Sequence, residues 1–143
     1  MPSNLLCATD GSKQAEKAIA YAVKQAKKSD ASLTFLNVVT VSSERAARTY
    51  FWDQDILDAS AAQVHKIMRA AMSAANKAKL SGATCVTVSG RDIAGAISAY
   101  AKKNGVDQII MGSHGRRGAA RLLLGSVAGS VAARSSCPVT IVP

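Results

Sequence analysis

The chain has 143 residues and a formal net charge of +9, and it is 48% hydrophobic but only 4% aromatic. This length suits one domain with one core, which we place over residues 1–143. No apolar stretch approaches the roughly 20 residues of a membrane-spanning helix, and no basic region precedes the first apolar run, so we expect a soluble cytoplasmic protein that does not contact membranes.

The distribution of basic residues, cysteines and histidines limits the partners and cofactors that the chain is expected to bind. Most lysines fall on outward faces of predicted helices and no aromatic residues are interleaved among them, so nucleic-acid binding has no support beyond the net charge. Cys7, Cys85 and Cys137 are far apart, and the two histidines lack nearby ligands. We therefore expect neither a disulfide framework nor a transition metal held by the protein.

Short apolar runs alternate along the chain with amphipathic segments of helical spacing. The apolar runs are nearly continuous, which is typical of parallel strands buried on both faces. The predicted strands are Asn4–Ala8, Leu33–Val39, Thr84–Val88, Gln108–Met111 and Val139–Val142. Predicted helices follow the first four strands and cover residues 15–26, 55–80, 93–101 and 127–134. This alternation predicts an α/β fold, a doubly wound five-stranded parallel sheet with helices on both faces.

Two strand ends carry residues suited to a binding site. The turn Thr9-Asp10-Gly11-Ser12 follows the first strand and contains a helix-capping residue. Gly112 follows the fourth strand and opens a glycine-rich and arginine-rich segment that ends at Ser126. In doubly wound sheets the ligand crevice opens where the winding direction reverses. We therefore expect these two strand ends to be neighbours, which gives the strand order 3-2-1-4-5.

The segment from Gly112 to Ser126 has the features of an anion-binding loop. Its glycines permit positive φ angles and let a ligand approach main-chain N–H groups. Ser126 begins a helix whose free N–H groups and dipole favour a phosphate, and Arg116, Arg117 and Arg121 add positive charge. The segment lacks both the Gly-Lys-Ser/Thr of a P-loop and the Gly-x-Gly-x-x-Gly of dinucleotide-binding folds.

The pattern Gly112-x2-Gly115-x9-Gly125-Ser126 resembles the nucleotide-binding motif of the universal stress protein family. The resemblance covers nearly the whole chain. One departure is Asn37, where histidine is frequent in the family, and we expect it to have no consequence for the pocket. Further matching segments are Thr9–Ser12, Asn37–Val39, Gly90, Met111–Gly118 and Ser136–Val139.

The resemblance implies that the chain binds ATP or a related adenine nucleotide. The residues assigned to this nucleotide are Asp10, Val39, Gly112, Gly115, Arg116, Gly125 and Ser126. By the resemblance, the adenosine end is held by Asp10 and the main chain of Val39, the ribose side by Gly112, and the phosphates by Gly115, Gly125 and Ser126. A carboxylate facing a triphosphate in a poorly solvated crevice is repelled, so Asp10 either contacts the nucleoside or shares Mg²⁺ with the phosphates.

Two classes of function stay open at this stage. The first is a stress-response protein whose nucleotide occupancy changes its partners, with hydrolysis slow or absent. The second is an enzyme that hydrolyses ATP or transfers a phosphate or nucleotidyl group at the same pocket. The sequence disfavours the enzyme, because it has no Walker lysine and no pair of carboxylates beside the glycine loop. His114, between a serine and a glycine, is expected to contribute its backbone rather than act as a general base.

The last predicted strand, Val139–Val142, lies at the sheet edge in the expected order. Pro138 and Pro143 bracket this strand, but no charged residue lies within it. Uncharged edges invite pairing, so we expect a two-fold homodimer in which the two copies pair antiparallel through this strand. The same dimer mode is common in the family that the chain resembles.

Overall fold

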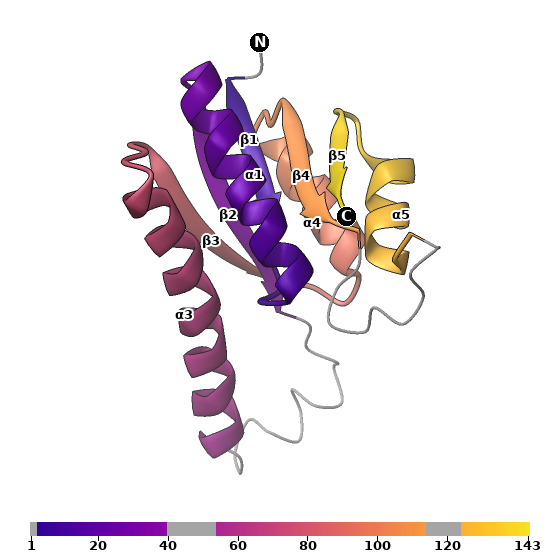
Figure 1. The fold of residues 1–143 in the computed structure, drawn as a ribbon. Coiled ribbons are helices and arrows are strands. Elements are labelled where there is room, and N and C mark those ends of the chain that lie inside the picture. Colours follow the sequence, from indigo (N-terminus) through magenta and orange to yellow (C-terminus); the bar gives the residue numbers. More distant parts are fainter. Residues whose placement is uncertain (1–2, 40–53, 114–123) are drawn as a thin grey trace.

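The structure, a computed structural model, describes residues 3–39, 54–113 and 124–143 of the chain. The elements are, in order, β1 (Asn4–Ala8), α1 (Lys13–Ser29), β2 (Ser32–Val39), α3 (Gln54–Lys77), β3 (Ala83–Ser89), α4 (Ile93–Lys103), β4 (Gln108–Gly112), α5 (Ser126–Arg134) and β5 (Val139–Val142). The strands form one parallel sheet in the order β3-β2-β1-β4-β5 (Figure 1). The predicted fold class and strand order are confirmed, and each predicted strand is correct to within one residue at either end.

The strand β1 lies in the middle of the sheet and marks the point where the winding reverses. On one side it pairs with β2, with Leu5 opposite Leu33, and on the other side with β4, with Leu5 opposite Gln108. From β1 the chain winds outward through β2 to β3, and then crosses back to β4 and β5. The carboxyl ends of β1 and β4 are therefore neighbours at the point where ligand crevices open in such sheets.

Helices cover both faces of the sheet and enclose two apolar clusters (Figure 1). Alternate residues of β1 point to opposite faces of the sheet. Leu5 and Cys7 pack with α1 and α3, whereas Leu6 and Ala8 pack with α4 and α5. The buried side chains of α1 are mostly alanine, which lets this helix lie close to the strands. This close packing has a direct effect on the candidate site, because α1 begins immediately after the turn that follows β1.

The end of α3 differs from the prediction. We expected the helix to run to Leu80 and to stop at Gly82, but it ends at Lys77. Lys79 has a φ of 57°, and the Leu80 N–H donates to the Ala75 carbonyl at 3.0 Å, which closes the helix end. The left-handed position after the helix, which is usually glycine, is occupied here by Lys79. The prediction took Gly82 as that position, and it therefore ended the helix three residues too late.

Candidate functional site

The candidate site lies at the carboxyl edge of the sheet, around the ends of β1 and β4. The β1 end leads into α1, and the first turn of α5 follows the segment after β4 (Figure 1). The structure thus brings together the two strand ends that the sequence singled out. Five of the predicted nucleotide-binding residues can be placed there: Asp10, Val39, Gly112, Gly125 and Ser126. Gly115 and Arg116 lie outside the described residues, as do His114, Arg117 and Arg121.

The turn after β1 is held by its own hydrogen bonds. One carboxylate oxygen of Asp10 accepts the Ser12 N–H at 2.9 Å, and Gly11 has a φ of +82°, which suits glycine. The Ser12 hydroxyl accepts the Ala15 N–H at 3.1 Å and so caps α1. These contacts fix the half-buried side chain of Asp10 just beyond the carboxyl end of β1.

The last residue of β4, Gly112, lies against the backbone of α1. A Cβ built at this position would lie 3.2 Å from the main-chain carbon and oxygen of Gln14, in the first turn of α1. Neither glycine uses the positive φ that this residue permits, since Gly112 is absent from the left-handed region and Gly125 has a φ of −59°. The glycine at 112 therefore permits the close packing of α1 over the end of β4.

The residues on either side of the segment 114–123 are hydrogen bonded to each other. The Ser113 N–H donates to the Val142 carbonyl at 3.0 Å, and the Gly125 N–H donates to the Ser113 carbonyl at 2.8 Å. The start of α5 is thereby held beside the ends of β4 and β5. Because the Gly125 N–H already has this acceptor, main-chain donors for a ligand at the start of α5 come from the residues that follow Gly125.

The first turn of α5 presents such donors. Gly125 is the N-cap and provides no side-chain hydrogen bond, and the Gly129 N–H makes the first bond within the helix, to the Gly125 carbonyl at 2.9 Å. The N–H groups of Ser126, Val127 and Ala128 have no acceptor among the described residues. No acidic residue lies in this turn, so the positive end of the helix dipole is not neutralised locally.

Val39 lies at the end of β2, on the far side of β1 from β4. Its carbonyl accepts the Gly90 N–H at 3.1 Å, which ties the end of β2 to the residue after β3. A carbonyl oxygen has a second lone pair, so this bond leaves Val39 able to accept from a ligand as well. The geometry is compatible with the main-chain role that the resemblance gave to Val39.

A model of the universal stress protein family matches residues 1–143. The universal stress protein YxiE of Bacillus subtilis (strain 168) is 32% identical over 147 residues, an alignment that covers 99% of each chain. The chain belongs to the universal stress protein family. Among solved structures, the universal stress protein UspA from Lactobacillus plantarum is similar with a TM-score of 0.87 and 27% identity, over 99% of this chain and 97% of its own.

A further relative of known structure was solved with a ligand. It is a universal stress protein in complex with cAMP, with a TM-score of 0.76 and 27% identity to this chain. The similarity covers 99% of this chain and 97% of the relative. A member of the family with the same architecture therefore accommodates a cyclic adenine nucleotide.

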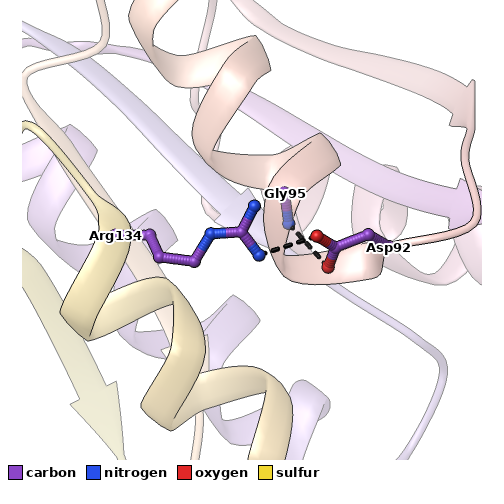
Figure 2. A network of polar contacts seen from close by, with 3 residues as sticks. All are labelled: Asp92, Gly95 and Arg134. Carbon is purple, nitrogen blue, oxygen red and sulfur yellow. Dashed lines mark hydrogen bonds and ion pairs between the residues drawn. The ribbon is translucent and has the colours of Figure 1, made fainter.

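An ion pair ties α5 to α4 on the face of the sheet opposite α1 and α3. Arg134, in the last turn of α5, donates to the Asp92 carboxylate at 2.7 Å, and Asp92 also accepts the Gly95 N–H at 3.1 Å as the N-cap of α4 (Figure 2). These hydrogen bonds hold the pKa of the Asp92 carboxyl below its usual range. A Cβ at Gly95 would lie 2.6 Å from a carboxylate oxygen of Asp92, so glycine makes room for the pair.

Other kinds of site find no support in the described part of the chain. No three His, Cys, Asp or Glu side chains come together there as a metal site. Burial raises the pKa of the Cys7 thiol to about 12, which makes Cys7 an unreactive core residue. In residues 3–39, 54–113 and 124–143, no helix combines the length and the apolar character needed to cross a membrane.

Two buried polar side chains at this edge were not assigned to the site from the sequence. Thr9 and Asn37 are the polar side chains among the buried residues of the described structure, each with an exposure of 5%. Thr9 was included only as part of a turn, and Asn37 only as a departure from the family pattern. A polar residue at an inward position of an otherwise apolar strand is the signal that could have identified them.

Proposed function

We propose that the protein binds an adenine nucleotide at the carboxyl edge of the sheet, with the phosphates at the first turn of α5. The observation that carries this proposal is the set of N–H groups of Ser126, Val127 and Ala128, which have no acceptor in the described structure. They follow Gly125, which is held at the end of β4, one of the two strands between which the winding of the sheet reverses. A phosphate there would accept hydrogen bonds from several of these donors and would be favoured by the helix dipole.

The nucleotide we propose is ATP, with Gly115 and Arg116 assisting at the phosphates. Support comes from the glycine motif and from the relative that holds cAMP, which has the same base with a single phosphate. Asp10 and the Val39 main chain would contact the adenosine. A single carboxylate suits Mg²⁺ only where phosphates supply further ligands, so Asp10 could share that ion only when the nucleotide is bound.

We propose a binding protein rather than an efficient enzyme. Among the described carboxylates, Asp92 is held by Arg134 and by the first turn of α4, so it is not free to work with Asp10. Ordinary enzymes turn over at roughly 1–1000 per second, and we expect ATP hydrolysis here to be much slower. A clean preparation that hydrolyses several ATP molecules per second, and loses this activity in Asp10→Asn, would establish the enzyme instead.

Mass spectrometry of the purified protein after denaturation tests the proposal. We expect a co-purified adenine nucleotide or, if purification strips it, saturable binding of added ATP. Protein that releases no nucleotide and binds no ATP would contradict the proposal. Dialysis against excess AMP before the measurement separates a tightly bound ATP from a weakly held one.

We also propose a cytoplasmic homodimer joined through β5. This strand ends the sheet, and its Val142 carbonyl points toward β4, where it accepts the Ser113 N–H. By alternation, the N–H groups of Val139 and Ile141 point away from β4. If a second copy pairs there, these two amides should exchange with deuterium slowly at high protein concentration and quickly on dilution. Fast exchange at every concentration would remove the dimer proposal.

A further inference from the structure

The α1 and α3 face of the sheet changes from apolar to polar at its carboxyl edge. On this face Leu5 of β1 lies opposite Leu33 of β2, and Cys7 lies opposite Phe35. Two residues further along each strand the same face carries Thr9 and Asn37. The Thr9 N–H donates to the Leu36 carbonyl at 2.9 Å, so the pairing of the two strands continues to this level. Thr9 and Asn37 are therefore neighbours in the last row of the sheet.

The row formed by Thr9 and Asn37, called the polar row below, continues onto β3. Asn37 lies opposite Thr87, whereas the row before it ends with Cys85 opposite Phe35. Thr87 is exposed, but Thr9 and Asn37 are each only 5% exposed. Apolar side chains would fill these two buried positions better if they served the core alone, because buried polar groups are costly unless they are hydrogen bonded.

The hydroxyl of Thr9 is the part of this row that core packing leaves unexplained. It is closed to water and has no hydrogen-bond partner among residues 3–39, 54–113 and 124–143. A buried hydroxyl without a partner destabilises the fold, and at the edge of a binding site a ligand can supply the missing bond. Thr9 directly precedes Asp10, which places it next to the proposed nucleoside end.

We propose that Thr9 and Asn37 recognise the nucleoside half of the bound nucleotide. The inference rests on the proposed function and adds the residues that select the ligand. The Thr9 hydroxyl, which has no partner in the described structure, would form a hydrogen bond with a polar atom of the sugar or base. The Asn37 amide, which can both donate and accept, would contact the same part of the ligand. The phosphates, at the first turn of α5, contact neither residue.

The test compares two ligands and two buried hydroxyls by calorimetry. ATP carries the nucleoside and inorganic triphosphate lacks it, so the pair separates the two halves of the site. Thr9→Val keeps the branched shape and removes the hydroxyl, and Thr9→Ser keeps the hydroxyl. Ser98 of α4 is the matched control, because its hydroxyl is also buried without a partner but lies in the layer on the other face.

We expect Thr9→Val to weaken ATP binding by roughly threefold to tenfold and to leave triphosphate binding unchanged. Its melting temperature without ligand should equal or exceed that of the wild type, because an unsatisfied buried group is gone. Thr9→Ser and Ser98→Ala should bind ATP like the wild type. Asn37→Leu, which removes the amide at similar volume, gives the same comparison if Thr9→Val does not fold.

Three outcomes would overturn the inference. If the wild type binds ATP and the folded Thr9→Val variant binds it equally well, the hydroxyl does not contact the ligand. If Thr9→Val loses ATP and triphosphate affinity together, or Ser98→Ala weakens ATP as much, the effect is structural. If the wild type binds neither ligand, the proposed function itself fails and the inference fails with it.

Discussion

Replacing Ser126 by proline tests the phosphate site with little disturbance of the fold. Ser126 is the first residue of α5, and its N–H has no acceptor in the described structure, so proline there removes a donor that the helix does not use. The residue before a proline must be extended, and Gly125 already has a φ of −59° and a ψ of 154°. The unfolding free energy should therefore stay within about 0.5 kcal/mol of the wild-type value.

The effect on the ligand should be much larger. A hydrogen bond from a main-chain N–H to a charged phosphate contributes about 1.5–3 kcal/mol, which corresponds to a roughly 10- to 150-fold loss of ATP affinity. Ser126→Ala is the matched control, since it removes the exposed hydroxyl and keeps the N–H. Calorimetric titration gives both affinities, and thermal unfolding without ligand verifies that each variant is folded.

The difference in ATP affinity between Ser126→Pro and Ser126→Ala gives the contribution of the Ser126 N–H alone. If folded Ser126→Pro binds ATP as tightly as Ser126→Ala, the phosphates do not lie at the first turn of α5 and the reasoning is refuted. If both variants lose affinity to the same large extent, the contact is made by the hydroxyl and not by the N–H.

Three further predictions concern stability. Gly112→Ala should lower the unfolding free energy by about 1–3 kcal/mol in urea titration without ligand, because its Cβ meets the Gln14 backbone; unchanged stability would show that α1 can shift. Asp30→Gly should raise that free energy by about 0.5–1 kcal/mol, since Asp30 has a φ of 53° at the negative end of α1, and a loss would refute this. Asp92→Asn keeps a capping side chain but removes the charge beside Arg134. The pKa of Asp92 is lowered in the fold, so its contribution is present at neutral pH and is lost as the pH falls below the ordinary aspartate pKa of about 3.9. The melting temperature of Asp92→Asn should be below that of the wild type at pH 7 and approach it near pH 3, and a gap that does not depend on pH would contradict this.

The architecture could be predicted because its signals are local. Each strand is a short apolar run, as a strand buried between two helical layers must be, and the turns and caps between the runs are encoded by neighbouring residues. The strand order could be predicted as well, because ligand crevices in such sheets have one usual location, and the turn at Asp10 and the strand end at Gly112 both carry residues suited to a site.

The parts that could not be predicted depend on contacts between distant residues. The reason for glycine at position 112 is the approach of Gln14, which only the packed structure shows. The polar row of Thr9 and Asn37 becomes visible once the two strands are placed in register. Gly115 and Arg116 lie outside the described residues, so their roles stay predictions.

The central claim is that the carboxyl edge of this sheet binds an adenine nucleotide, and calorimetric titration of the purified, nucleotide-free protein with ATP tests it most directly. We predict saturable binding of one ATP per chain, with affinity reduced in Ser126→Pro. A folded wild-type protein that takes up no ATP at millimolar concentration, with or without Mg²⁺, would contradict the claim.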